Sequence, residues 1–241
     1  MGSTDAERKR FSRQLRGEQA RLHDDEGPRH RVKLTQGFWL ADTACTQALW
    51  QALMGDNPSN FKGDLQMPVE NVSWDDVTAK FLPTLQRSLG GATVALPSEA
   101  QWEYACRAGS ETAFALGDVV AAEQVNFDGN YPCPGQPKGI YRETTVPVKA
   151  LAANRRGLYQ MHGNVWEWCA DGNRSYAAAG IEAPAVDPQG PTDVGASAHR
   201  ALRGGSWISG ARLCRSASRN AARRGGRHDN FGFRLALSSP A

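Results

Sequence analysis

The middle of the chain, from residue 110 to residue 200, contains no long run of periodically spaced hydrophobic residues. It consists of short polar and glycine-rich pieces such as "FDGNYPCPGQPKGIY" and "DPQGPTDVGA". Glycine and proline interrupt regular elements, and the 241 residues include 25 glycines and 13 prolines. Loops of this length in a compact domain are uncommon unless they are functional or held by a ligand or an ion. The sequence therefore predicts a loop-rich, irregular fold.

Regular elements are expected on both sides of this region. The segment "RVKLTQGFWL" alternates as a half-buried strand does, and Thr46 and Ser73 can each cap a following helix. Ser98 with a glutamine three residues later forms a capping box, which predicts a third helix. The strand-like segments "HRALRGGSW" and "FGFRLAL" close the chain. Without a repeat or a linker, the sequence favours a single domain over residues 28–237.

The N-terminal residues 1–27 carry many charges and no apolar core segment, which excludes a secretory signal. We expect an exposed helix or tail there, which could join a partner domain or subunit. The chain has no run of eighteen apolar residues, so the sequence predicts no transmembrane helix and no membrane partner. These features favour a cytoplasmic protein.

The five cysteines are an odd number, are widely spaced and include no CxxC pair. This pattern suits neither a zinc site nor a disulfide framework. Buried free thiols are the simplest interpretation for Cys45, Cys106, Cys133 and Cys169. Cys214 lies in "GGSWISGARLCRS" near the C-terminus. It is either half of a catalytic pair or one point on a binding surface that does no chemistry.

The net charge of +3 is small, but residues 200–234 contain nine arginines, no lysine and one acidic residue, Asp229. Two interpretations of these arginines stay open. They can belong to a recognition surface, where arginine is enriched. They can also form a solvated face with ion pairs to the acidic residues of "SWDD" and "SEAQWE". No ladder of aromatic residues accompanies them, so the segment does not favour a nucleic acid as partner.

Several motifs then occur in order over most of the chain: "GFWLADTACTQALW", "NPSNFKG", "MPVENVSWDDV", "LPSEAQWEYACRAG", "NFDGNYP", "GLYQMHGNVWEWCAD", "ALRGGSW" and "NFGFRLA". Together they resemble the formylglycine-generating enzyme-like (sulfatase-modifying factor) family. The resemblance implies a C-type-lectin-related α+β fold with a small twisted antiparallel sheet, two or three helices and long ordered loops. A fold hosts many functions, so the site must be argued separately.

Active members of this family use two copper(I)-binding cysteines, five residues apart, just after a glycine-glycine-serine-aromatic motif. By this resemblance Ser206 and Trp207 match the motif, and the second cysteine falls on Cys214. The first falls on Ser209, whose hydroxyl cannot supply a thiolate for copper(I). The histidines also lack the HxxxHxE spacing of the iron site found on this fold. Copper is therefore not expected. The alternative, a copper-dependent or other redox enzyme that uses Cys214 assisted by Ser206, stays open.

The resemblance also implies a structural calcium site. Its ligands would be the side chain of Gln160, the carbonyls of Gly163 and Val165, and the carboxylate of Glu167, all hard oxygen donors. Gln160 departs from the acidic or asparagine residue of many relatives, and a neutral donor should weaken binding. Glu167 could instead be a buried carboxylate that accepts from backbone N–H groups. A second family site, starting at Asn126, lacks a clear acidic partner downstream.

The window between "RGGSW" and "GFR" carries the main functional hypothesis. Some relatives are variable proteins of diversity-generating retroelements, whose ligand-facing codons are rewritten at template adenines. The residues in this window are compatible with that rewriting, and short side chains on loops beside arginine and tryptophan suit a binding surface. We therefore expect a non-catalytic domain that binds an unknown protein or small-molecule ligand. Its expected contact residues are Trp207, Ile208, Ser209, Gly210, Leu213, Ser218, Arg223, Arg224, Arg227, His228 and Asp229.

Overall fold

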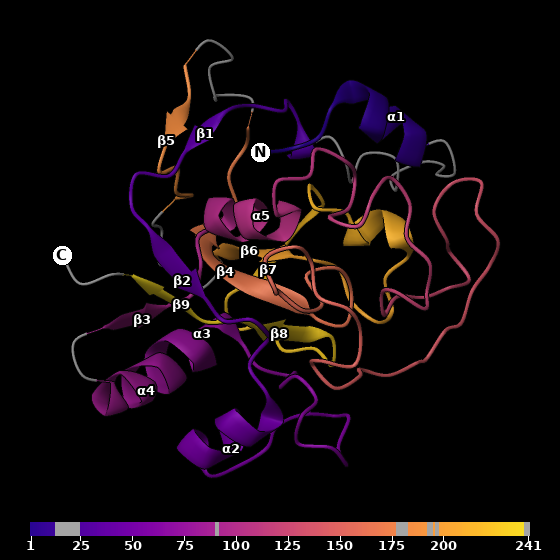
Figure 1. The fold of residues 1–241 in the computed structure, drawn as a ribbon. Coiled ribbons are helices and arrows are strands. Elements are labelled where there is room, and N and C mark those ends of the chain that lie inside the picture. The colour runs from indigo at the N-terminus through magenta and orange to yellow at the C-terminus, as the bar shows by residue number, and fades with distance from the viewer. Residues whose placement is uncertain (13–24, 90–91, 177–182, 192–194, 196–197, 239–241) are drawn as a thin grey trace.

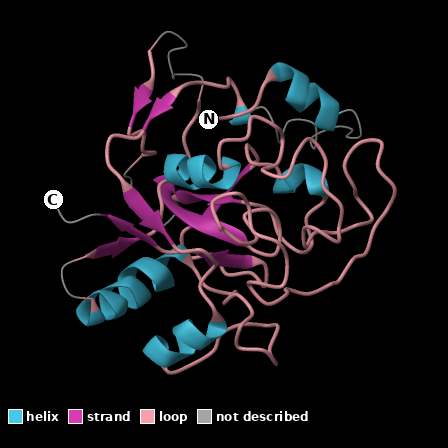
Figure 2. Ribbon diagram, viewed as in Figure 1, coloured by secondary structure: helices cyan, strands magenta, loops and turns pink. Residues whose placement is uncertain are grey.

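The computed structural model describes residues 1–12, 25–89, 92–176, 183–191, 195 and 198–238. Across these residues, helices are short, and no helix is both long and apolar enough to cross a bilayer. Residues 108–165 form no helix or strand and run through turns, bends and isolated bridges (Figure 2). The loop-rich character predicted for the middle of the chain is confirmed.

The described helices lie mainly in the first half of the chain. They are α1 (Asp5–Ser12), α2 (Gln47–Met54), α3 (Trp74–Asp76), α4 (Leu82–Ser88) and α5 (Glu99–Arg107), with a π-helical stretch at Val77–Phe81 and a 3₁₀ turn at Ala211–Cys214. The predicted caps are present. Thr46 Oγ1 accepts from the Leu49 amide at 3.2 Å, and Ser73 and Ser98 each close a capping box.

The strands of the described residues form three small sheets. The four-stranded sheet has the strand order β7-β6-β4-β8. It consists of β4 (Trp166–Gly172), β6 (His199–Arg203), β7 (Arg219–Arg223) and β8 (Phe231–Phe233). The three-stranded sheet has the strand order β2-β9-β3, with β2 (Phe38–Leu40), β9 (Ala236–Ser238) and β3 (Thr93–Ala95). In the two-stranded sheet, β1 (Val32–Lys33) pairs in parallel with β5 (Ala185–Val186). Only β4–β8 is parallel within the four-stranded sheet. The single strand expected over "RVKLTQGFWL" is thus divided between β1 and β2.

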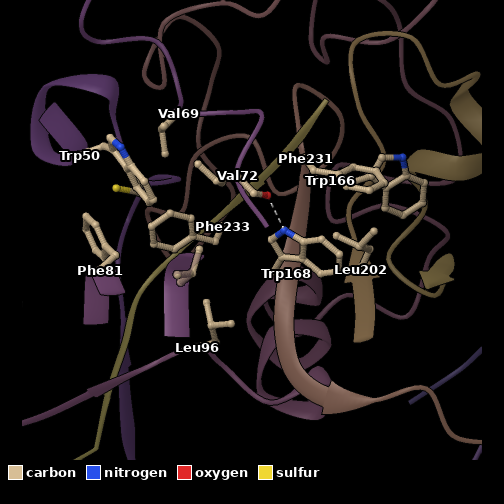
Figure 3. Packing of buried hydrophobic residues seen from close by; sticks show 12 residues of the cluster. Trp50, Val69, Val72, Phe81, Leu96, Trp166, Trp168, Leu202, Phe231 and Phe233 are labelled. Atoms are coloured by element: carbon tan, nitrogen blue, oxygen red, sulfur yellow. Dashed lines mark hydrogen bonds between the residues drawn. The ribbon is translucent and has the colours of Figure 1, made fainter. Parts of the chain in front are cut away.

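Helices lie on both faces of the four-stranded sheet (Figure 1). Successive side chains of β4 point to opposite faces and so contact different helices. Trp166 and Trp168 point to one face and pack with residues of α2 and of the α3–α4 region. Trp168 Nε1 donates to the Val72 carbonyl at 3.0 Å, and Trp50 stacks on Phe81 at 5.2 Å (Figure 3). The two tryptophans of "GNVWEW" are therefore core residues. The opposite face packs against α5.

Buried arginine–glutamate pairs hold α5 and the C-terminal strands together. Arg203 donates to Glu103 at 2.6 Å, and Arg219 donates to both oxygens of Glu99 at 2.6 and 2.9 Å. All four side chains are almost completely excluded from solvent. The ion pairs with "SEAQWE" that the sequence offered as one interpretation of the arginines are confirmed. Removing one partner would leave a buried charge, which costs far more than a surface pair contributes.

The described part of the N-terminal segment packs on the domain rather than lying exposed. Phe11 of α1 is 1% exposed and meets Phe114 edge-on at 6.2 Å. The Gly2 amide donates to Glu103 at 2.8 Å, and the buried Arg215 donates to Glu26 at 2.7 Å. Sequence periodicity missed this packing because α1 has only one large apolar residue, and its partners lie about a hundred residues or more away along the chain.

Candidate ligand-binding surface

A tight glycine turn after β6 sets the position of Trp207. Gly204 and Gly205 both have left-handed backbones, with φ of +98° and +75°. A Cβ on Gly205 would lie 2.5 Å from the Cys214 sulfur, so only glycine fits there. The turn leads to Trp207, whose amide donates to the Asn164 carbonyl at 2.9 Å and whose indole Nε1 donates to the Asp229 carbonyl at 3.2 Å. Trp207 is thereby fixed against the loop before β8.

Aromatic side chains from distant loops surround Trp207. The ring of Phe61 meets it edge-on at 5.1 Å, and the ring of Tyr141 lies nearly parallel to it at 6.2 Å. Ile208 is 49% exposed beside them. Tyr131 is 68% exposed, and a Cβ on Gly210 would lie 2.9 Å from its Cβ, so Tyr131 borders this group. The sequence motifs "NPSNFKG" and "NFDGNYP" held part of this signal, but their contact with Trp207 is tertiary.

The hydroxyl groups near Trp207 face inward. The Oγ atoms of Ser206 and Ser209 lie 3.0 Å apart, and Ser209 Oγ also accepts from the Ser206 amide at 3.1 Å. Asn230 donates to Ser206 Oγ at 3.2 Å. Ser209 is 6% exposed and Ser218 is fully buried. Both serines, expected as contact residues, lie inside the domain.

Cys214 is completely buried in an apolar cluster that includes Cys133 and Ala211. Burial raises the pKa of the Cys214 thiol, which disfavours the reactive thiolate. The other four cysteines are also buried and free, as expected. His162 donates from Nδ1 to the Cys214 carbonyl at 2.7 Å, and burial lowers the pKa of His162 to about 4. The thiol therefore has no access to solvent, and the effect of burial on its pKa outweighs the opposite effect of the Arg215 charge.

The arginines at the end of β7 face α3. Arg224 donates to Asp75 at 2.6 Å, and Arg227 donates to both oxygens of Asp76 at 2.7 and 2.8 Å. These are the ion pairs with "SWDD" that the sequence left open. Arg223 is exposed.

The remaining expected contact residues divide between the core and the surface. Leu213 packs in part against the core, and the His228 ring packs on Phe231 at 4.6 Å. Of the expected residues, the structure gathers Trp207, Ile208, Gly210 and Asp229 at one place.

A buried acid that sequence reasoning missed lies against this group. Glu70 is fully buried and its Oε1 accepts from the Phe61 amide at 2.8 Å. The next residue, Asn71, donates its amide to the His228 carbonyl at 2.9 Å, which brings Glu70 beside Asp229. Burial, and then the Asp229 carboxylate, raise the pKa of Glu70 to about 7. We define the aromatic–acidic site as Trp207, Phe61, Tyr141, Glu70 and Asp229.

The calcium ligands implied by the resemblance fit only in part. Gln160 Oε1 is buried without a hydrogen-bond partner, as a vacant oxygen donor would be. Glu167, however, accepts from Arg234 at 2.6 and 2.8 Å and from Trp102 Nε1 at 2.6 Å. Its charge is therefore neutralised by an arginine. Gly163 has a φ of +77° and donates its amide to the Gly204 carbonyl at 2.7 Å, which places it next to the glycine turn.

The donor set at Gln160, Gly163, Val165 and Glu167 lacks a free carboxylate, which calcium sites normally provide. Within the part of the chain that the structure describes, no three His, Cys, Asp or Glu side chains gather as metal ligands would. The arrangement does not favour calcium at this place.

Comparison with known proteins identifies the family and the fold of the chain. The family model of the sulfatase-modifying factor enzyme 1-like domain matches residues 11–239. The formylglycine-generating enzyme of Streptomyces coelicolor is 36% identical over 187 residues, which is 74% of this chain and 55% of that protein. The formylglycine-generating enzyme of Thermomonospora curvata is 32% identical over 183 residues, 73% of this chain and 55% of that protein. The chain thus spans about half the length of the curated relatives it matches.

Solved structures show the same fold. Variable protein 1 of Treponema denticola superposes with a TM-score of 0.73 and 28% identity, covering 87% of each chain. PvdO from Pseudomonas aeruginosa superposes with a TM-score of 0.70 over 99% of this chain and 90% of that chain, at 24% identity. The expected α+β, C-type-lectin-like architecture is confirmed, and the chain belongs to the family of sulfatase-modifying factor enzyme 1-like domains.

Proposed function

We propose that this chain is a non-catalytic binding domain whose ligand, a protein or a small molecule, contacts the surface around Trp207. The observation that carries the proposal is the state of Cys214. Its sulfur is fully buried, and the residue five positions before it is Ser209, which lies inside the domain. A two-thiolate copper(I) site cannot form from one thiol and one hydroxyl.

The likeness to variable protein 1 of Treponema denticola supports a more specific proposal, that the window 207–229 is diversified by a retroelement. Within this window, Ile208 and Arg223 are exposed and can vary without disturbing the core. His228 is also exposed, although its ring packs on Phe231. Trp207 and Arg219 are held by core contacts and would stay constant. Such a pattern of variable loops on a fixed scaffold suits a recognition surface.

The alternative is a redox enzyme that uses Cys214 assisted by Ser206. The observation in its favour is the 36% identity with a formylglycine-generating enzyme. The burial of Cys214 and the direction of its pKa speak against it. The free, buried thiols support a reducing compartment, and we propose a cytoplasmic location on that basis.

Anaerobic copper(I) titration tests the choice between the two functions. We expect no specific copper(I) binding to the purified chain, and no change in Cys214→Ala. Tight one-to-one binding that disappears in Cys214→Ala would overturn the binding-domain proposal and support the redox enzyme. Ser209→Cys is the matched variant. If the pocket can hold copper once a second thiol is supplied, only this variant should gain binding.

A further inference from the structure

The aromatic–acidic site combines a group of aromatic rings with nearby carboxyl groups. Three aromatic rings from separate segments meet at Trp207, with Phe61 edge-on at 5.1 Å and Tyr141 nearly parallel at 6.2 Å. Aromatic faces attract cations through the ring quadrupole, and tryptophan is the strongest of the three residue types. Trp207 is 7% exposed, whereas Tyr141 and Phe61 are only partly buried, so the group meets solvent through these two rings.

Three carboxylates lie near enough to Tyr141 to act on its phenol. After burial, the charges of Asp128, Glu143 and Asp229 are what raise the pKa of the Tyr141 phenol. The Asp229 carbonyl accepts from the Trp207 indole, so the residue is in direct contact with the aromatic group. The chain as a whole carries a net charge of +3, which makes this local excess of acidic groups a departure from its general charge.

An unpartnered buried oxygen gives an independent indication of a missing ligand. Glu70 is fully excluded from solvent, yet its Oε2 has no hydrogen-bond partner among the described residues. Buried polar atoms nearly always have a hydrogen-bond partner, so an unpaired carboxyl oxygen is a reason to look for a ligand nearby. Its Oε1 accepts from the Phe61 amide, and the Asn60 backbone N–H also acts on the carboxyl. The charged groups that act on it are Asp229 and Lys62. The Lys62 side chain is exposed.

We propose that the aromatic–acidic site binds an organic cation, an alkylammonium or guanidinium group, on its solvent side, at the partly exposed Tyr141 and Asp229. The inference rests on the proposed function and names the chemistry of its ligand. A cationic group would contact the aromatic group and would add positive charge beside the Asp229 carboxylate, close to Glu70. The same chemistry is present in free amines and in the lysine or arginine side chains of a protein partner.

Binding measurements with matched probes test the proposal. Choline and its neutral carbon isostere 3,3-dimethyl-1-butanol have the same shape and differ in charge. An acetyl-Gly-Arg-Gly-amide peptide and its citrulline counterpart make the same comparison for guanidinium. We expect each cation to bind at least ten-fold more tightly than its neutral counterpart by calorimetry or ligand-observed NMR. Tighter binding of the peptide than of choline would indicate that the natural ligand is a protein side chain. The reverse order would indicate a small free organic cation.

Variants locate the binding. Asp229→Asn and Tyr141→Leu should each reduce the affinity for the cationic probes by at least five-fold. Glu111→Gln, an exposed acid outside the site that faces Arg29, should leave them unchanged. If the neutral probes bind as well as the cations and both depend on Tyr141, the binding-domain proposal stands and the cation inference is wrong. If no probe binds, the cation inference is also wrong. Only Cys214-dependent copper(I) binding would overturn the proposed function itself.

Discussion

The buried carboxyl of Glu70 should make the stability of the protein depend on pH in a specific window. The pKa of Glu70 is about 7 in the folded chain and 4.5 ordinarily, because burial disfavours the ionised form. A carboxyl whose folded pKa is raised contributes stability that is complete below its unfolded pKa. That contribution is lost as the pH rises through the folded pKa. The loss therefore begins near pH 4.5 and is complete above pH 7.

The size of the effect follows from the two pKa values. Each tenfold change in proton affinity corresponds to about 1.4 kcal/mol, so the full loss is about 3 kcal/mol. Most of it, about 2.5 kcal/mol, falls between pH 5 and pH 8. Glu70→Gln keeps the volume and the acceptor for the Phe61 amide but cannot ionise. We expect the variant to gain about 2.5 kcal/mol on wild type between pH 5 and pH 8.

Urea unfolding of both proteins at four pH values from 5 to 8 measures this difference directly. His162 also titrates near this range, since burial lowers its pKa to about 4, and it favours stability at higher pH. Because His162 is common to both proteins, its contribution cancels in the difference between them. Glu111→Gln, at an exposed acid, should give a flat difference curve. A flat curve for Glu70→Gln as well would refute the reasoning.

Three further outcomes are expected. Native protein at pH 8 should resist iodoacetamide at Cys214 by mass spectrometry, while unfolded protein reacts, because the thiol is fully buried; rapid native alkylation would contradict this. Glu99→Gln, which leaves Arg219 buried without its carboxylate, should cost about 3–5 kcal/mol in urea unfolding, whereas Asp75→Asn at a half-exposed pair should cost about 1 kcal/mol or less. Treatment with EDTA should leave the Tm unchanged, because the Glu167 carboxylate already accepts hydrogen bonds from Arg234 and Trp102. A Tm that falls with EDTA and is restored by calcium would show that calcium is bound.

Local features of the fold were readable from the sequence. The capping boxes at Ser73 and Ser98 are formed by residues three positions apart, so the sequence alone contains both partners. The irregular middle region follows from its glycines and prolines, which act on their own backbone. The serine at position 209 is likewise a fact of the sequence, and it removes the first of the two cysteines that active members of the family use. These signals need no knowledge of what lies elsewhere in the chain.

The site depended on contacts that no local pattern contains. Arg224 finds Asp75 from 149 positions away, and Trp207 meets Phe61 and Tyr141 from two separate loops. Ser218 looked like a surface residue and is buried, while Glu70, unremarked in the sequence, is the acid beside Trp207. Burial and pairing are properties of how distant segments meet, because they depend on which atoms replace water around each group. Only the tertiary structure therefore decided which polar residues face a ligand.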